Sequence, residues 1–211
     1  MMLSRISAGP RWVRLLLIGL LTAIALAVGF TGGVFAGQLT APGTDSPEAG
    51  FARDMSTHHA QAVELAMTAY PKATQPEVRI WALDIATSQE FQIGQMQTWL
   101  EQWHLDPTGD RAAMAWMPNG ANELRADGLM PGMATDAERA KLRAATGIQV
   151  DILFCQLMIR HHLGGLHMIE GALKLSHNGQ VRELAQGMYN LQRGEVDMMQ
   201  QLLKELGAPL N

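Results

Sequence analysis

The sequence contains one cysteine, few aromatic residues and no cluster of basic residues. The single Cys155 cannot form an intrachain disulfide bond. The formal net charge is −4, and the Lys and Arg residues are not grouped as phosphate neutralisation requires, so the sequence argues against nucleic acid as a partner. No strand-like alternation of polar and apolar residues persists along the chain. We therefore expect an all-α fold.

Methionine, in contrast, is abundant, with 14 residues in a chain that is 47% hydrophobic. Methionine fills irregular gaps in protein cores, and composition alone favours this interpretation. Its thioether is also a ligand for soft metal ions. The positions of the methionines along the helices indicate which of these two roles, core packing or metal binding, applies.

The N-terminal segment, residues 1–38, has the pattern of a signal peptide or a membrane anchor. An uncharged stretch at residues 15–38, long enough to span a bilayer, follows three arginines, Arg5, Arg11 and Arg14. Residues 34–36 (Val-Phe-Ala) fit a signal-peptidase site, whereas the length of the stretch favours a retained transmembrane helix. Both alternatives place the rest of the chain outside the cytoplasm.

Beyond a linker at residues 39–50, which is rich in Pro and Gly, we expect four long helices and one short helix. The long helices are predicted at residues 48–69, 76–103, 148–175 and 180–206. Residues 135–138 (Thr-Asp-Ala-Glu) match a capping box that opens the short helix. The connection at residues 104–153 begins as an irregular segment that carries several prolines and glycines.

A shift of the chain by 103 residues aligns residues 51–103 with residues 154–206 without a gap. Twelve of the 53 aligned positions are identical, which is more than chance provides. The identical pairs include Phe51/Phe154, Met55/Met158, His58/His161, His59/His162, Gln89/Gln192 and Met96/Met199. We interpret this as the duplication of a helical hairpin, and two such hairpins predict a four-helix bundle over residues 51–211.

Each repeat carries a Met-x-x-His-His cluster within an arc of about 100° on its first helix, together with apolar residues, and this arc is the expected buried stripe. The clusters are Met55, His58 and His59 in the first repeat and Met158, His161 and His162 in the second. The stripes of the partner helices add Gln89, Met96, Gln192 and Met199. Imidazoles and thioethers should therefore converge inside the bundle, with the two glutamines orienting the imidazoles.

A buried imidazole without a partner costs about 1–3 kcal/mol, so these side chains need hydrogen bonds or a metal ion. One such histidine is usually a hydrogen-bonded core residue, but two adjacent pairs with nearby methionines indicate a metal site. Thioether and imidazole together suit copper, particularly Cu(I). Zinc would require more cysteine or carboxylate, and a di-iron site requires a Glu-x-x-His motif on each of two helices, whereas the sequence has one such motif, at residues 101–104. Haem with His/Met ligation remains an alternative, although a C-x-x-C-H motif is missing.

Several other residues have two interpretations. Cys155 shares the stripe of the third long helix, as a small buried hydrophobic residue or as a further Cu(I) ligand. The methionines of the connection either capture metal ions or pin the connection to the bundle; they are Met114, Met117, Met130 and Met133. His104, His167 and His177 are expected at the surface.

At these residues the sequence resembles the DUF305 family, over about residues 48–206, through FARDMSTHHAQAVELA, MPGMAT and DILFCQLMIRHHLGGLHMIEGA. The resemblance implies a ferritin-like four-helix bundle without a settled enzymatic activity, and some members look like periplasmic copper-binding proteins. Carried over, it implies metal ligands at Met55, His58, His59, Met96, Met158, His161, His162 and Met199. The chain departs from the family pattern at Gly165 and at Glu170, which stands where the first repeat has Met67. We therefore expect the second site to be poorer than the first.

These observations lead to three hypotheses. The first is an exported or membrane-anchored protein that sequesters or transfers Cu(I), without catalysis. The second is a helical interaction module that binds no metal, in which the histidine pairs are hydrogen-bonded core residues. The third is an oxidoreductase that uses bound copper or haem.

Overall fold

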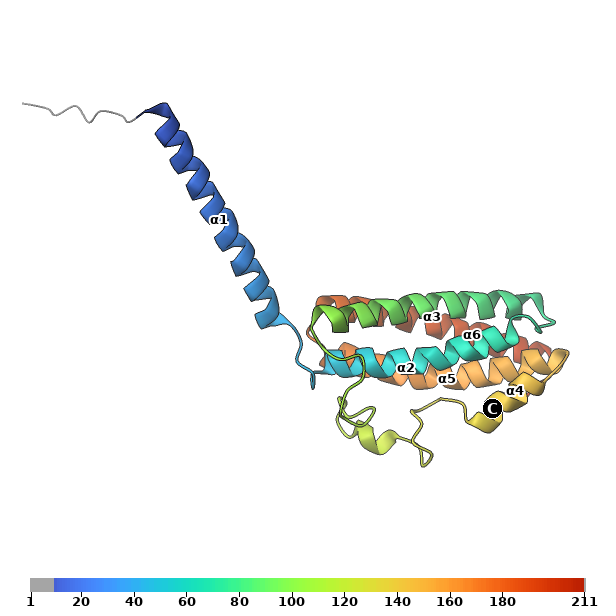
Figure 1. Ribbon diagram of the computed structural model, residues 1–211. Helices are drawn as coiled ribbons and strands as arrows, with labels where there is room; N and C mark the ends of the chain where they lie inside the picture. The colour runs from blue at the N-terminus through green and yellow to red at the C-terminus, as the bar shows by residue number, and fades with distance from the viewer. Residues whose placement is uncertain (1–9, 211) are drawn as a thin grey trace, which may run out of the picture. The chain divides into compact units, whose positions relative to one another are not determined.

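A computed structural model describes residues 10–210 of the chain (Figure 1). Its elements are α1 (Arg11–Thr40), α2 (Pro47–Ala69), α3 (Pro76–Gln102), the 3-10 helix η1 (Gly120–Glu123), α4 (Asp136–Ala144), α5 (Ile148–Leu175) and α6 (Gly179–Glu205). The described part of the chain is helical and contains no strand, which confirms the predicted all-α fold. It divides into one unit that ends at Ala41 and a second unit that starts at Pro42. We call the second unit the helical domain.

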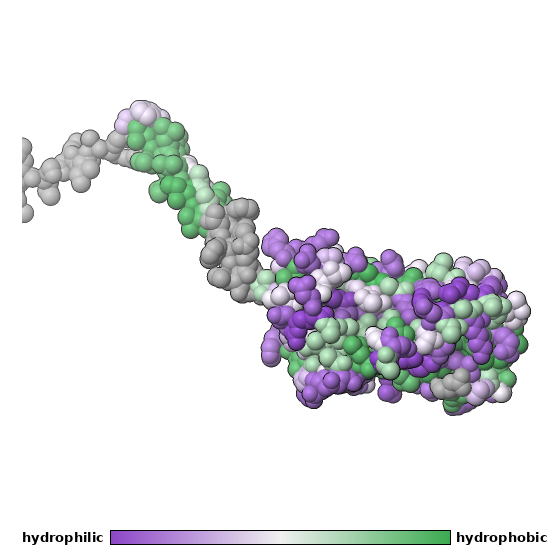
Figure 2. Space-filling view, turned by 60° about the horizontal axis from the view of Figure 1, so that its bottom comes forward, coloured by the Kyte–Doolittle hydropathy of each residue, from purple (hydrophilic) through white to green (hydrophobic). Residues whose placement is uncertain are grey.

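The first unit contains α1, a continuous helix of 30 residues. Large apolar side chains along it are exposed and form a hydrophobic surface (Figure 2), among them Leu15, Leu16, Ile18, Leu20 and Leu21. Within residues 10–210, no helix is long and apolar enough to cross a membrane. Arg5, which the sequence prediction also used, lies outside the described residues.

The long helices of the helical domain begin and end within one residue of their predicted bounds. Side-chain caps mark the start of α2, of the short α4 and of α6. The side chain of Ser46 accepts a hydrogen bond from the Ala49 backbone N–H at the start of α2. Thr135 and Glu138 form the predicted capping box at the start of α4. The side chain of Asn178 accepts hydrogen bonds from the first N–H groups of α6.

The four long helices lie side by side (Figure 1), with α2 packed against α3 and α5 packed against α6. The two helical hairpins meet where α2 packs against α5, and the short α4 contacts both of these helices. Ion pairs hold α4 in place, because Arg143 binds Glu64 of α2 at 3.1 Å and Arg160 of α5 binds Glu138 at 2.7 Å. The end of the connection is thereby fastened to both hairpins.

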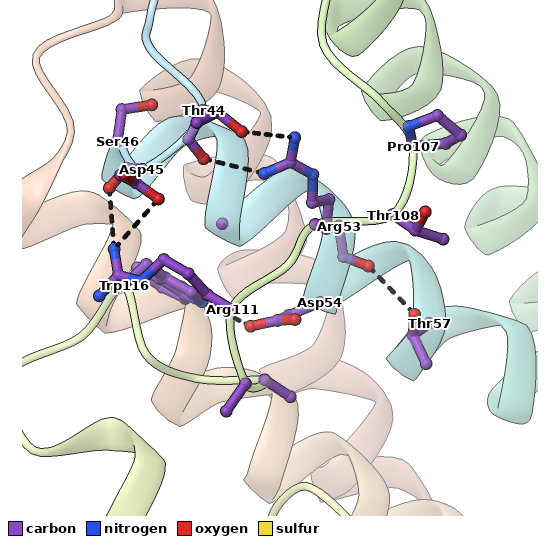
Figure 3. Close-up of a pocket in the computed structure, with 14 residues that line it drawn as sticks. Thr44, Asp45, Ser46, Arg53, Asp54, Thr57, Pro107, Thr108, Arg111 and Trp116 are labelled. Atoms are coloured by element: carbon purple, nitrogen blue, oxygen red, sulfur yellow. Dashed lines mark hydrogen bonds and ion pairs between the residues drawn. The ribbon is translucent and has the colours of Figure 1, made fainter.

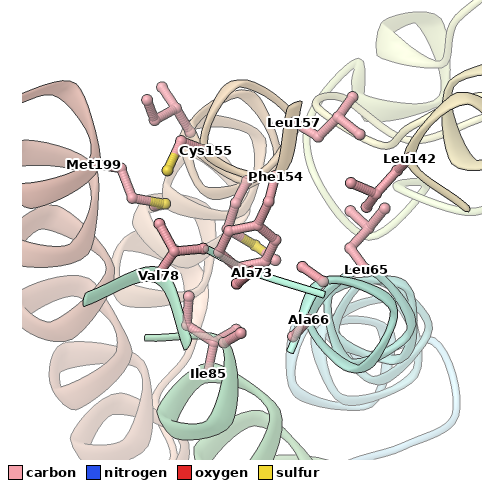
Figure 4. Close-up of a cluster of buried hydrophobic side chains, with 14 of the residues drawn as sticks. Leu65, Ala66, Ala73, Val78, Ile85, Leu142, Phe154, Cys155, Leu157 and Met199 are labelled. Carbon is pink, nitrogen blue, oxygen red and sulfur yellow. The ribbon is translucent and has the colours of Figure 1, made fainter. Parts of the chain in front are cut away.

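The apolar core consists of two clusters at opposite ends of the hairpins. Cluster 1 (Figure 4) includes Leu65, Val78, Ile85, Phe154, Cys155, Met158 and Met199. Cluster 2 includes Phe51 and eight methionines, Met55, Met96, Met114, Met117, Met130, Met133, Met168 and Met188. Each of the four long helices contributes residues to both clusters. The middle turns of these four helices therefore lie between the two apolar clusters.

Two buried carboxylates tie each hairpin to the turn of the other hairpin. Asp151 at the start of α5 accepts a hydrogen bond of 3.0 Å from the Thr74 backbone N–H, in the turn between α2 and α3. Glu48 at the start of α2 accepts hydrogen bonds from the Ser176 hydroxyl at 2.8 Å and from the His177 backbone N–H at 2.9 Å. Asp151 lies 103 residues after Glu48, the same shift that aligns the two halves of the sequence. We call these contacts the reciprocal clamps.

Candidate metal centre

A layer of polar side chains crosses the helical domain between the two apolar clusters. We call it the polar layer. It takes two residues from the middle of each long helix, and all eight are buried: His58 and His59, Gln89 and Gln92, His161 and His162, and Gln192 and Glu195. The predicted histidines thus lie on the core face of α2 and α5, as their helical spacing requires.

The polar layer is centred on contact between two imidazole rings. The ring centroids of His58 and His161 lie 3.8 Å apart, with an angle of 37° between the ring planes. The centroids of His161 and His162 are 6.4 Å apart. His58 and His161 are equivalent in the repeat alignment, so the two Met-x-x-His-His clusters meet at their histidines.

Three of the four imidazoles use the Nε2 atom for a hydrogen bond. His59 Nε2 lies 2.7 Å from Gln92 Oε1, and His162 Nε2 lies 2.6 Å from Glu195 Oε2. His58 Nε2 lies 3.1 Å from the carbonyl oxygen of Pro131, in the connection. A carbonyl or carboxylate oxygen accepts, so in each pair the ring donates from Nε2. This leaves the Nδ1 lone pair free for another ligand.

Six buried polar atoms of this layer have no hydrogen-bond partner. They are Nδ1 of His58, His59 and His162, Nε2 of His161, and Oε1 of Gln89 and Gln192. Leaving one buried polar atom unpaired costs about 1–3 kcal/mol, and native proteins rarely group such atoms. All six atoms are of types that carry a lone pair, so a bound cation is the kind of ligand that would satisfy them together. The donor chemistry therefore fits a metal ion.

Burial keeps three of these imidazoles uncharged at neutral pH, those of His58, His59 and His161. It lowers the pKa of His58 to about 4 and the pKa of His59 to about 3, and it holds the pKa of His161 well below the usual value of 6.5. Repulsion between neighbouring imidazoles lowers the pKa values further. A histidine binds a metal ion only when it is neutral, so the lowered pKa values of these three side chains suit a cation at neutral pH.

The predicted thioether ligands lie on both sides of the polar layer. Met55 and Met96 belong to cluster 2, whereas Met158 and Met199 belong to cluster 1. Within residues 10–210, no group of three or more His, Cys, Asp or Glu side chains is placed to hold a metal ion. The histidines therefore do not form a complete cage by themselves, and any ion held here needs thioether or amide donors as well.

Comparison with known proteins identifies the family. The family model described as "Domain of unknown function (DUF305)" matches residues 48–203, which is most of the chain. The chain belongs to the DUF305 family. No curated protein matches it.

Solved structures of DUF305 proteins share this fold. A protein of Streptomyces coelicolor that is predicted to be secreted is 41% identical, with a TM-score of 0.72, and the match covers 80% of this chain and 99% of that chain. A DUF305 fragment from Deinococcus radiodurans is 34% identical, with a TM-score of 0.62, and covers 75% and 96%. CopM in its Cu(II)-bound form is 26% identical, with a TM-score of 0.59, and covers 76% and 97%.

The MPGMAT motif of this DUF305 protein lies across the polar layer as a strap. Besides the contact of Pro131 with His58, the Gln61 amide donates to the Ala134 carbonyl at 3.0 Å and accepts from the Ala134 N–H at 2.5 Å. A Cβ atom at Gly132, where φ is +80°, would lie 2.4 Å from the carbonyl oxygen of Arg160. Close approach of backbone to backbone therefore requires glycine in the strap.

The methionines of the connection pack against the helices. Met114, Met117, Met130 and Met133 are all buried in cluster 2, which favours their interpretation as side chains that pin the connection to the helical domain. Met117 also lies over Gly171 of α5, where an added Cβ would meet its sulfur at 2.9 Å.

The pair interactions of the polar layer correct one prediction. Gln89 and Gln192 were expected to orient the imidazoles, but the oxygens of both amides are unpaired. The residues that do so are Gln92 and Glu195, about one helical turn further along α3 and α6. The sequence signal that could have found them is their equal spacing, because each stands 33 residues after the histidine that it binds.

The remaining candidate ligands lie outside the polar layer. Cys155 is fully buried in cluster 1, where burial raises the pKa of its thiol to about 12. His104, His167 and His177 are exposed, as the sequence predicts, and His167 pairs with Glu123 at 2.6 Å.

A pocket of about 220 Å³ lies between the start of α2 and the connection (Figure 3). Its charged groups are already engaged. Arg53 donates to the carbonyl oxygens of Thr44 at 2.8 Å and Asp106 at 3.0 Å. The Asp54 carboxylate accepts from the Trp116 indole N–H at 2.8 Å. We interpret the pocket as the place where the connection is attached to α2.

Proposed function

We propose that this DUF305 protein binds copper ions, with Cu(I) preferred, and sequesters or transfers them without catalysis. The observation that carries the proposal is the set of unpaired lone-pair atoms in the polar layer, which includes one ring nitrogen from each of the four histidines. The proposed ligands are His58, His59, His161 and His162 with the thioethers of Met55, Met96, Met158 and Met199.

Donor type supports copper over harder ions. Imidazole with thioether is a soft ligand set, which suits Cu(I) and disfavours Mg²⁺ or Ca²⁺. CopM, a structural neighbour, is known in Cu(I)-bound and Cu(II)-bound forms. A bound copper ion would supply the positive charge that the unpaired nitrogens and oxygens of the polar layer lack.

The proposal includes export and a duplicated architecture. The arginines before an apolar N-terminal stretch fit a signal peptide, and the Streptomyces neighbour is also predicted to be secreted. Equivalent contacts recur at the 103-residue shift, in the reciprocal clamps and in the pairs His59–Gln92 and His162–Glu195. These contacts support two duplicated hairpins, residues 51–103 and 154–206, that form a four-helix bundle.

Titration of the full-length protein with Cu(I), in competition with a chromophoric Cu(I) chelator, tests the proposal. We expect affinity tighter than micromolar and a loss of at least tenfold in His58→Ala and His161→Ala. His167→Ala, an exposed histidine on α5, is the matched control and should bind like the wild type. Weaker than micromolar binding, or equal binding by all variants, contradicts the proposal.

The hydrogen bonds of three histidines favour one alternative, in which the pairs are structural core residues. This alternative predicts that His58→Ala lowers the melting temperature while neither Cu(I) nor a chelator shifts it in the wild type. Copper binding predicts instead that the melting temperature rises as the concentration of free Cu(I) increases. At a free Cu(I) concentration one hundred times Kd, the free energy of unfolding is higher by about 2.7 kcal/mol.

A further inference from the structure

The polar layer contains two matched pairs that differ in one chemical group. In the first hairpin, His59 Nε2 lies 2.7 Å from the amide oxygen of Gln92. In the second, His162 Nε2 lies 2.6 Å from the carboxylate of Glu195. The pairs are equivalent in the repeat alignment, and all four side chains are buried. One half of the candidate metal centre thus has a neutral amide where the other has a carboxylate.

The carboxylate fixes the position of the imidazole proton. A carboxylate oxygen can only accept, so the His162 ring donates from Nε2 to Glu195. A second proton on Nδ1 would have no acceptor, because that atom has no partner in the structure. The surroundings therefore select the ring form in which the Nδ1 lone pair points to the candidate ion.

The amide leaves this choice open. Rotation of the Gln92 side-chain amide by 180° presents an N–H donor to His59 Nε2 in place of the oxygen. The proton of the ring then moves to Nδ1, which can no longer bind a cation. A metal ion that binds His59 must select one of two ring forms, whereas His162 is held in the competent one.

The carboxylate of Glu195 also favours a cation at His162 over one at His59. The side chain of Glu195 is 8% exposed, and within residues 10–210 no Lys or Arg forms an ion pair with it. A monovalent cation next to His162 would be balanced by this carboxylate inside a region of low dielectric constant. A cation next to His59 would find only the dipole of an amide.

We propose that Glu195 makes the two halves of the metal centre unequal, so that the His162 half takes the first soft monovalent cation and holds it more tightly. The inference rests on the proposed copper binding. Glu195 is a positioning residue that acts through His162. The order is opposite to the one expected from Gly165 and Glu170. Met67 and Glu170 are both exposed, so this exchange removes no side chain from the polar layer.

Two isosteric exchanges test this assignment. Glu195→Gln should weaken the tightest Cu(I) step by about 10–100-fold, the usual effect of removing a hydrogen-bond partner of a metal-bound histidine. Gln92→Glu should strengthen the weaker step by a similar factor. Glu183→Gln, an exposed acid-to-amide change on α6, the helix of Glu195, is the matched control and should leave both steps unchanged.

A second measurement needs no metal. Nitrogen-15 NMR of the metal-free wild type should show His162 with its proton on Nε2 alone, and Glu195→Gln should show a mixture of the two ring forms. Circular dichroism establishes that each variant is folded. If Glu195→Gln does not fold, the Cu(I) affinity of Gln92→Glu tests the proposal. A tighter second binding step supports the role of the carboxylate, and an unchanged step refutes it.

The outcomes separate the two proposals. If the wild type binds no Cu(I), the proposed function fails and this inference fails with it. If the wild type binds Cu(I) but both exchanges leave the binding steps unchanged, the inequality of the halves is refuted while the proposed function stands.

Discussion

Replacing Gly164 with alanine is expected to push the MPGMAT strap away from α5. An added Cβ atom at this position would lie 2.0 Å from the carbonyl oxygen of Pro131 and 2.9 Å from the Cα atom of Gly132. Both neighbours are backbone atoms, which cannot turn aside as the end of a flexible side chain can. Because Pro131 also accepts the hydrogen bond of His58, its displacement breaks that contact.

Three contributions set the size of the effect on the free energy of unfolding. Forcing a methyl group into a packed interface costs about 1–3 kcal/mol. Leaving the buried ring N–H of His58 without an acceptor costs about 1–3 kcal/mol more. Alanine recovers about 1 kcal/mol relative to glycine inside a helix. The middle of these ranges is a net loss of about 3 kcal/mol, or a fall in melting temperature of about 6–12 °C for a domain of this size.

Thermal unfolding followed by circular dichroism measures this change. The matched control is Gly187→Ala in α6, where an added Cβ meets nothing within 4 Å. The control should gain about 1 kcal/mol from helix propensity alone. If Gly164→Ala melts at or above the temperature of the wild type, the strap is not held against α5 by this contact.

Three further predictions concern other buried groups. Asp151→Asn should lower the free energy of unfolding by about 2 kcal/mol, since it weakens hydrogen bonds to a charged group, whereas Asp84→Asn on the exposed face of α3 should change little in a urea titration. In the metal-free protein, unfolded histidines gain protons below pH 6.5 while folded His58 stays neutral until about pH 4. As the pH falls from 6.5 to 4, the free energy of unfolding should therefore fall by about 3 kcal/mol because of His58, and His59 should lower it further. A free energy of unfolding that stays constant from pH 7 to 4 would contradict the burial of these two imidazoles. Cys155 should react with an aromatic disulfide reagent only after unfolding, and rapid labelling of the native protein would disprove its burial in cluster 1.

The helices were predictable because their signals are local. Ser46, the capping box at Thr135 and the Asn178 cap each stand next to the helix that they start. The burial of His58 and His59 was predictable for a related reason, because helical periodicity places them on the apolar stripe of their own helix. These properties depend on residues within a few turns of one another.

The hydrogen-bond partners depend on how helices are set against each other, which periodicity does not report. Gln89 and Gln92 both face the core of α3, and only the offset between α2 and α3 decides which one meets His59. The contact of His58 with Pro131 spans 73 residues and depends on the course of an irregular connection. Sequence reasoning therefore placed the histidines on the core face but did not find their hydrogen-bond partners.

The reciprocal clamps have a consequence for how an ion could leave the polar layer. The contacts of Asp151 with Thr74 and of Glu48 with Ser176 span 77 and 128 residues, so each hairpin closes an end of the other. Separating the two hairpins would break both clamps together with the two apolar clusters on either side of the histidines. For an ion bound as proposed above, exchange is therefore expected to be slow and to proceed by rearrangement of side chains within an intact scaffold. The lifetime of that bound state would then depend on the fold as much as on the side chains that hold the ion.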